Sequence, residues 1–567
     1  MRTALVCGSL LAAAAVFAAF PLIALDLPLH LAMGEIILDR GTVPATNIVL
    51  HTQENTPYVN DKWLHEVVVR LAYRAAGTAG LHGLRWVLVL ATVAAAFALA
   101  RRLAGPGPAG LAVLLVVPIL VHRLALRPEL WSYLLAAIFL FALLAPRADR
   151  PARLLALVPL QVLWANLHVY FPLGPGLTVL IGATRHGRRR WWTLGLGGML
   201  AAASLLTPAG PEGLLQPFRV AASLGPLGEG AIGEATAVWS PSMPWTFPRI
   251  ALIVAAGFAG IGLLRARGRV PPAVWVAAVP LLVLGTFLHR NLPLAGLGIM
   301  LLLAAAPPLS KPAWDIRLVP AAAAAMILLV LTGPLADPAL DGRCLGVGWS
   351  ERMFPFRAAR FLADRRPAGE VFNDIASGGC YVFVAFPGKR AFIDGNTSGY
   401  PESFLEEYRK VLALETPHRT LTRKYRVTHF LLRHDAPATR FLVPALFRDE
   451  GLVLAYYDAV ATVLMAREVA PDLADRRREW LREVLPHVRD ALFPDRERAE
   501  PLLRNATALV ESHPERVEDL TREACRLDPW EPRTFRIAAM ACRKQRKPAE
   551  EMRAWHTASL LEGKLPR

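Results

Sequence analysis

Residues 25 to 47 read LDLPLHLAMGEIILDRGTVPATN and follow directly on an apolar run that begins after Arg2. The segment presents Asp26, His30 and Asp39 as soon as the apolar run ends, and it then turns at GTVP. The apolar run could serve as a secretory signal, because a basic residue precedes small and apolar ones. Since the same pattern recurs as far as residue 336, we expect it to be a retained first membrane helix.

The composition is that of a membrane protein with several spans. Hydrophobic residues make up 54% of the 567 positions and charged residues only 19%, which is too apolar for an ordinary soluble domain. A single crossing needs roughly 17 to 25 apolar residues. About eleven stretches approach this requirement; they lie near residues 4–24, 81–100, 108–122, 130–145, 152–166, 169–184, 191–206, 249–264, 271–288, 291–307 and 317–335.

The charges between these stretches predict the orientation. Arginines gather in alternate connections, for example at Arg101 and Arg102 and at 188–190, which the positive-inside rule places in the cytoplasm together with the N-terminus. An odd number of spans then places everything after residue 336 outside. The net charge of +17 is explained by this topology, and we see no basic, aromatic-rich soluble face that would indicate nucleic-acid binding.

Three regions follow from these patterns. Residues 1–336 form a polytopic α-helical transmembrane domain with a long first outer loop, 25–80. Residues 337–470 alternate β-type runs, including GEVFNDIASGGCYVFVAF and KRAFI, with helical ones, which predicts a small extracytoplasmic α/β domain. Residues 471–567 predict a helical tail that contains one or two tetratricopeptide-like units. One or two units are too few for a solenoid that is stable by itself. We therefore expect the tail to dock on the α/β domain or on a protein partner.

The five cysteines show neither a CxxC motif nor zinc-ligand spacing. Disulfides are permitted outside the membrane, where four of them would lie. We favour buried free thiols over any particular pair.

The first outer loop carries the main candidates for catalysis. Its apolar spacing predicts two amphipathic helices along the membrane. Asp26 and His30 share a face of the first helix; Asp61 and His65 share a face of the second, with Glu66 beside them. A sugar transferase needs a carboxylate that takes the proton from the acceptor hydroxyl at the water boundary. The structural alternative is that Asp26 caps the first helix, whose first turn contains a proline.

Three other outer segments place polar residues at span boundaries. RLALRPEL contains Arg123 and Arg127, WANLHVYF contains His168, and FLHRNLPLAG contains Arg290 and Asn291. Arginine suits the phosphate of a lipid-linked donor. The alternative for each arginine is interfacial snorkelling at a helix end.

A further pair of polar candidates lies in the α/β domain. Asp394 and Asn396 follow the expected strand KRAFI, and ligands gather at the carboxyl ends of strands in open sheets. A turn stabilised by Asp-Gly chemistry explains the same residues equally well.

The motifs LDLPLHLAMGEIILDRGTVP, DKWLHEV, LRPELWSYLLA, WANLHVYFPLG, HRNLPLAG and VFNDIASGGCYVFVAFPGKRAFIDGN together resemble a family of bacterial membrane proteins. This family has a GT-C glycosyltransferase-like core, similar to the dolichyl-phosphate-mannose and aminoarabinose transferases, with an extracytoplasmic α/β domain and often a tetratricopeptide tail. The resemblance covers nearly the whole chain. It implies a multi-pass protein of the bacterial inner membrane that acts on a polyprenyl-phosphate-linked sugar at the extracytoplasmic face.

The resemblance also implies roles for residues. Asp26 would be the catalytic base, and Asp61 or Glu66 would be a second acid that could bind a divalent cation. Seven residues would attend the substrates: His30, His65, Arg123, Arg127, His168, Arg290 and Asn291.

Departures from the family pattern fall on the acids and aromatic residues that the mechanism would use. They are Ala24, Pro28, Leu29, Asn47, Lys62 and Asn396. The alternative function is therefore a non-catalytic scaffold or assembly protein of the cell envelope that keeps the fold. A lipid or polysaccharide transporter is a third reading, although we see neither repeated hydrophobic halves nor ionisable groups in mid-span.

Overall fold

A computed structural model describes most of the chain, namely residues 2–120, 123–144, 151–223, 247–266, 268–287, 289–307, 312–332, 345–350, 352–396, 400–434 and 436–562. The chain divides into two compact units. Unit 1 comprises Met1–Thr46 and Pro57–Ser350, and unit 2 comprises Asn47–Thr56 and Glu351–Arg567.

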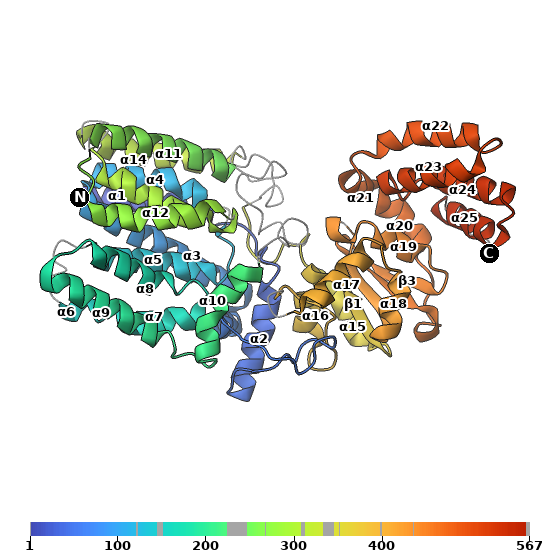
Figure 1. The fold of residues 1–567 in the computed structure, drawn as a ribbon, viewed down its shortest axis with the longest axis horizontal. Coiled ribbons are helices and arrows are strands. Elements are labelled where there is room, and N and C mark those ends of the chain that lie inside the picture. Colours follow the sequence, from blue (N-terminus) through green and yellow to red (C-terminus); the bar gives the residue numbers. More distant parts are fainter. Residues whose placement is uncertain are drawn as a thin grey trace. The chain divides into compact units, whose positions relative to one another are not determined.

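The described part of unit 1 is built from helices (Figure 1). They are α1 (Arg2–Phe17), α2 (Leu27–Arg40), α3 (Trp63–Leu103), α4 (Pro106–Leu120), α5 (Glu129–Leu143), α6 (Pro151–Leu154), α7 (Leu157–Leu167), α8 (Leu173–Ala183), α9 (Gly187–Ala203), α10 (Pro211–Ser223), α11 (Phe247–Ala266), α12 (Pro272–Phe287), the 3-10 turn η4 (His289–Asn291), α13 (Leu292–Ala305) and α14 (Pro312–Leu331). Long runs of Ala, Leu and Val favour helix and supply the apolar surfaces through which these helices pack.

The two helices predicted in the first outer loop are both present. α2 ends at Gly41, whose φ of +67° is the left-handed conformation that glycine adopts at helix ends. The second predicted helix is the first part of α3, which kinks at Ala76 and Gly77 before its apolar part begins. Gly77 has a φ of +58°, so the kink depends on glycine at this position. The loop helix and the apolar helix that follows it are thus two helices joined at this kink.

The number of membrane spans stays a prediction. Two described helices, Trp63–Leu103 and Pro248–Ala266, are long and apolar enough to cross a membrane by length and composition. Other apolar helices are shorter: 15 residues, as in α4, span about 22 Å against a hydrocarbon core of about 30 Å. Residues 121–122, 145, 288 and 333–335, at the ends of expected spans, lie outside the described residues.

Unit 2 contains a four-stranded sheet in the order β1-β2-β4-β3. β1 pairs with β2 in parallel, and β4 is antiparallel to both β2 and β3. The strands are β1 (Glu370–Asn373), β2 (Val427–Arg433), β3 (Leu452–Tyr457) and β4 (Ala461–Ala466). The helices and 3-10 turns are α15 (Phe356–Arg365), α16 (Ile375–Ala385), α17 (Glu402–Leu412), α18 (His418–Lys424), η7 (Pro437–Thr439), α19 (Leu442–Phe447), η8 (Arg467–Val469), α20 (Arg477–Glu483), α21 (Leu485–Leu492), η9 (Arg496–Arg498), α22 (Ala499–Leu509), α23 (Pro514–Leu527), α24 (Pro532–Lys544) and α25 (Pro548–Leu561). The mixture of helices with a small sheet matches the expected α/β character.

Two expected β-type runs differ in the structure. The run that starts at Glu370 is a strand for four residues only. Asp374 then begins α16, because its carboxylate accepts hydrogen bonds from the backbone N–H of Ser377 at 3.0 Å and from that of Arg433 at 2.9 Å. The run KRAFI forms only an isolated bridge, between Ala391 and Leu50.

A ten-residue piece of the first outer loop, Asn47–Thr56, belongs to unit 2. Ala391 donates its N–H to the carbonyl of Val49 at 3.0 Å and accepts the N–H of His51 at 3.0 Å. Nε2 of His51 lies 2.9 Å from the carbonyl oxygen of Val371 in β1. Residue 391 therefore finds its partner in a segment that is more than three hundred residues earlier in the chain.

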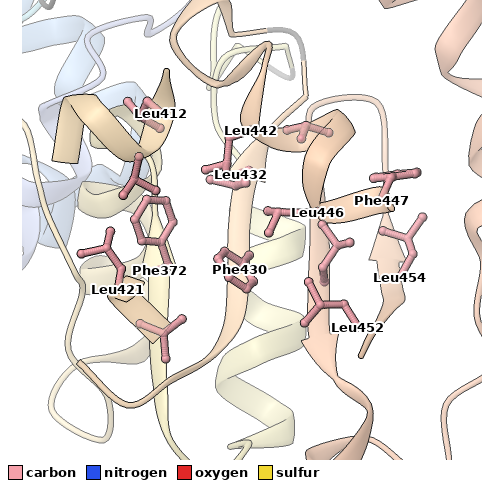
Figure 2. Packing of buried hydrophobic residues seen from close by; sticks show 14 of the residues in the cluster. Phe372, Leu412, Leu421, Phe430, Leu432, Leu442, Leu446, Phe447, Leu452 and Leu454 are labelled. Atoms are coloured by element: carbon pink, nitrogen blue, oxygen red, sulfur yellow. The ribbon is translucent and has the colours of Figure 1, made fainter. Parts of the chain in front are cut away.

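The tail shares a hydrophobic core with the α/β part of unit 2. Phe372, Phe430 and Leu454 line the core from the strands, as Figure 2 shows. Trp480 and Trp530 come from the tail and stack around Phe447 with ring-centroid distances of 4.6 and 5.4 Å. Of the two docking partners expected for the tail, the α/β domain is thus the one the structure shows.

The last four helices form the antiparallel pairs expected of tetratricopeptide-like units. α22 packs against α23, and α24 packs against α25. Assignment to that repeat family stays a prediction. The described cysteines, Cys7, Cys380, Cys525 and Cys542, are free thiols.

Trp480→Ala is expected to destabilise unit 2. Trp480 is fully buried, and removing a buried aromatic side chain costs roughly 3–5 kcal/mol. Urea unfolding of the full chain in detergent, followed by tryptophan fluorescence, measures the change. Met552→Ala on α25, where the side chain is 71% exposed, is the control and should leave the unfolding midpoint unchanged. Equal midpoints for the two variants would contradict this core.

Candidate functional site

Asp26 occupies the position just before α2, but it does not cap the helix. Its φ of −80° and ψ of −16° are helical, and its side chain makes no capping hydrogen bond. One physical reason is Pro28, which lies at the second position of the helix and has no N–H to offer. The helix therefore does not use the side chain of Asp26, a partly exposed residue. The catalytic interpretation of Asp26 stays a prediction.

Helix α2 and the first part of α3 approach most closely at Gly34. A Cβ added there would lie 2.1 Å from the carbonyl oxygen of Glu66 and 2.7 Å from Cβ of Arg70. These two distances leave no room for a side chain at residue 34, so only glycine allows this approach. His30 is one turn before Gly34 on the same face of α2, and it is therefore held against α3.

Glu66 is buried between His30 and Asn60. Nδ1 of His30 lies 3.3 Å from Oε1 of Glu66, and Nδ2 of Asn60 donates to Oε2 at 2.6 Å. Only 1% of Glu66 is exposed, so both carboxylate oxygens are engaged inside the protein, as a buried carboxylate requires. This arrangement orients His30 and leaves Glu66 poorly placed to meet a substrate.

Asp61 forms an ion pair with Lys62, the next residue in the chain. Nζ of Lys62 donates to Oδ1 of Asp61 at 3.2 Å. Burial acts to lower the pKa of Lys62, but attraction from Asp61, Glu66 and Asp26 outweighs burial and raises the pKa above its usual value. Three carboxylates thus share one ammonium group, which stays charged at neutral pH.

His65 is fully buried next to His30. The two rings meet edge to face with centroids 5.1 Å apart. Nε1 of Trp131 donates to Nδ1 of His65 at 3.1 Å, so Nδ1 accepts and the ring proton belongs on Nε2. Within the described residues Nε2 has no hydrogen-bond partner. His65 therefore carries a fixed donor that the surrounding protein leaves unused.

His168 lies beyond the end of α7 and joins a second set of polar groups. Nδ1 of His168 is 2.8 Å from the hydroxyl of Ser132, which also accepts the indole N–H of Trp164 at 2.8 Å. Burial lowers the pKa of His168 to about 4, although Glu129 and Asp61 act in the opposite direction. The electrostatic effect of Asp61 on His168 shows that this set adjoins the α2–α3 cluster.

Arg123 forms an ion pair with Glu129, and the charge of Arg127 also acts on this carboxylate. Nη2 of Arg123 lies 3.6 Å from Oε1 of Glu129, and its Nε donates to the carbonyl oxygen of Arg290 at 3.2 Å. Arg127 acts on Glu129 electrostatically. Arg123 is buried, so its charge is balanced mainly within the protein.

Arg290 and Asn291 complete the set from the 3-10 turn before α13. The hydroxyl of Tyr170 donates to Oδ1 of Asn291, and Nδ2 of Asn291 donates to the carbonyl of Leu284 at 3.1 Å. The guanidinium of Arg290 also meets Tyr170. Nε of Arg290 has no hydrogen-bond partner among the described residues, so of the three arginines it is the one that keeps a documented donor for an anion.

The candidate residues are related in two ways: hydrogen bonds, ion pairs and ring contacts link eight of them, and Asp26 and Arg127 act electrostatically on Lys62 and Glu129. All ten candidate residues lie in unit 1. They are Asp26, His30, Asp61, His65, Glu66, Arg123, Arg127, His168, Arg290 and Asn291. Sequence reasoning missed four of the groups that hold them, which are Asn60, Trp131, Ser132 and Tyr133. Most of these residues lie in or next to a sequence motif that also contains a candidate residue, and this proximity in the sequence could have identified them.

Asp394 in unit 2 stabilises a turn. Its Oδ1 accepts the N–H of Asn396 at 2.9 Å and the hydroxyl of Tyr400 at 3.0 Å. The expected strand before it is absent from the described elements, so the geometry agrees with the turn interpretation.

The described residues do not offer a metal site. No three or more His, Cys, Asp or Glu side chains within the described ranges are placed to share an ion. The acids of the cluster are instead paired with Lys62 and His30.

No protein-family model matches the chain, and no curated protein matches it in sequence. Its fold is similar to that of the Archaeoglobus fulgidus oligosaccharyltransferase with a tethered acceptor peptide, with a TM-score of 0.52, 11% identity, and coverage of 77% of this chain and 70% of that one. A complex of the same archaeal protein with Zn and sulfate gives a TM-score of 0.49 at 11% identity over 82% of this chain and 74% of that one.

The mycobacterial arabinofuranosyltransferase AftD gives a TM-score of 0.48 at 16% identity, with coverage of 82% of this chain and 41% of that one. The neighbours have the GT-C fold. The first of these matches shows that this chain has a fold of that type. The subtype expected from the sequence stays a prediction.

Gly34→Ala is expected to push α2 away from α3. The added Cβ would overlap the carbonyl of Glu66, and overpacking of this kind costs roughly 1–3 kcal/mol. Thermal unfolding of the full chain in detergent measures the loss. Gly83→Ala in α3, where a Cβ meets nothing within 4 Å, is the matched control. A Gly34→Ala variant as stable as Gly83→Ala would be incompatible with the close approach.

Glu35 is expected to give the protein an acid-sensitive contribution to stability. Hydrogen bonds from Arg70 and Arg74 lower the pKa of Glu35 to about 2. A carboxyl with a depressed folded-state pKa stabilises the fold above its unfolded value of about 4.3 and loses that contribution as the pH falls towards 2. Glu35→Gln should therefore be less stable at pH 7 and should flatten the thermal-stability profile between these values. A profile identical to that of the unmodified chain would count against the ion pairs.

Proposed function

We propose that this chain is a membrane glycosyltransferase of the GT-C type that transfers a sugar from a polyprenyl-phosphate-linked donor to an acceptor at the extracytoplasmic face of a bacterial inner membrane. The fold supports the general class, and the cluster in unit 1 supports the location of the reaction. The observation that carries the proposal is Asp26, a partly exposed residue one helical turn before His30 that makes no capping hydrogen bond, whereas Glu66 and Asp61 are already engaged.

Asp26 acts as the general base. It takes the proton from the acceptor hydroxyl while that oxygen attacks the anomeric carbon, which inverts its configuration. Glu66 is excluded from this role by burial and by its two hydrogen bonds. Asp61 is less suited to it, because the neighbouring Lys62 neutralises much of its charge.

Arg290 stabilises the leaving group. The bond between the anomeric carbon and the donor phosphate oxygen breaks as the new bond forms, so negative charge grows on the polyprenyl phosphate. A guanidinium with a free Nε–H at the same cluster can donate to that oxygen. Arg123 and Arg127 hold Glu129 and the backbone of residue 290 in place.

The alternative is a non-catalytic envelope scaffold, and one observation favours it. Lys62 stands where the family pattern has a glutamate, and it reduces the negative charge around Asp26. A scaffold would tolerate this change. A transferase would have to work with carboxylates whose negative charge Lys62 partly neutralises.

Asp26→Asn is expected to reduce sugar transfer by about 10²–10⁴-fold, the usual contribution of a general base. The assay uses the purified full chain in vesicles with a panel of radiolabelled undecaprenyl-phosphate sugars and measures release of the lipid phosphate. Asp39→Asn is the matched control, because Asp39 is an exposed acid on the same helix, and it should leave transfer unchanged.

Transfer that persists in Asp26→Asn at the control rate would remove Asp26 as the base. Absence of turnover by the unmodified chain with every sugar in the panel, together with normal folding, would favour the scaffold.

A further inference from the structure

Helix α10 exposes apolar side chains and buries a polar one. Leu215 is 47% exposed and Phe218 is 64% exposed, whereas Gln216 is 8% exposed. Leu215 and Phe218 are three residues apart and therefore share a face. On another face, a Cβ at Gly213 would lie 2.6 Å from Oγ1 of Thr207, so that side of the helix is packed on the preceding turn.

A charged pair borders the exposed apolar face. Arg219 and Glu212, two helical turns apart, form an exposed ion pair at 2.5 Å. An apolar stripe with charges along its edge is typical of a helix that lies in the membrane interface, because the charges stay in water while the stripe enters the acyl region.

The direction of α10 agrees with such a position. In Figure 1, α10 runs across the direction of α7 and α9, as α2 also does. A helix that runs across the direction of bundle helices in a membrane protein lies along the bilayer surface, not through it.

The apolar face of α10 continues an apolar surface that begins on α9. Met199 is 49% exposed, Leu205 40% and Leu206 65%, and a short turn joins Leu206 to α10. The carbonyl of Leu206 accepts from Nδ2 of Asn166 at 2.9 Å, and Asn166 accepts the indole N–H of Trp63 at 2.7 Å. The start of α10 is therefore tied to the same end of the bundle as the candidate site.

We propose that α10 is a membrane-docking helix whose Leu215 and Phe218 insert into the acyl-chain boundary of the leaflet beside the candidate site. The occupant of this face is bulk phospholipid, because the face continues the apolar surface of α9 and is edged by a charged pair. The docking fixes the depth of the site at the water boundary. It holds whether or not the cluster transfers a sugar.

Photolabelling of the full chain tests the proposal. The protein is reconstituted in vesicles of phosphatidylethanolamine and phosphatidylglycerol that contain a trace of phosphatidylcholine with a diazirine on its acyl chain. After illumination, mass spectrometry locates the lipid adducts. We expect adducts at Leu215 and Phe218, as well as at Leu264 of α11, which is 81% exposed and serves as the internal reference for correct insertion.

Two variants sharpen the result. Leu215→Ser combined with Phe218→Ser should lose the α10 adducts and keep those at Leu264, whereas Glu212→Gln, which leaves the apolar face intact, should keep both. Labelling of α10 by a water-soluble diazirine but not by the lipid would overturn the proposal. So would labelling by a polyprenyl-phosphate diazirine alone, or cross-links at α10 between two copies of the chain, because each identifies a different occupant.

Discussion

The approach of α2 to α3 at Gly34 is the constraint on which the candidate site depends. With a backbone carbonyl in the space that a side chain would fill, the two helices bring His30 into contact with Glu66. The remaining polar groups then follow from this contact, because Glu66 fixes Asn60 and His65 packs against His30. The absence of a side chain at Gly34 thus permits the close helix packing on which this buried polar network depends.

The site combines groups that are closed to substrate with groups that are open to it. Glu66 and Arg123 are buried and paired within the protein, Glu66 with His30 and Arg123 with Glu129. Asp26 makes no capping hydrogen bond, and Nε of Arg290 has no hydrogen-bond partner among the described residues. A satisfied network of this kind restricts the motion of the residues next to it, including the proposed base Asp26 and the proposed phosphate-binding Arg290.

Helical periodicity predicted both loop helices, since motif spacing carries local information of this kind. The roles of the ten candidate residues stay predictions. The same methods could not supply the partners across the bundle. In the sequence, Trp131 and Ser132 look like ordinary helix residues. Only the fold shows that they hydrogen-bond to His65 and His168. The run KRAFI forms only an isolated bridge. Its pairing partner lies in the first outer loop, a relation that no local pattern contains. The glycine-rich run after Asp374 is helical since that carboxylate caps it.

Segment Asn47–Thr56 makes unit 2 discontinuous in sequence. A fragment cut out at Glu351 would lack the strand-like stretch that pairs with Ala391 and the imidazole that meets Val371. Unit 2 therefore needs a segment of the first outer loop to be complete. A transfer of unit 2 to another protein would have to carry these ten residues along.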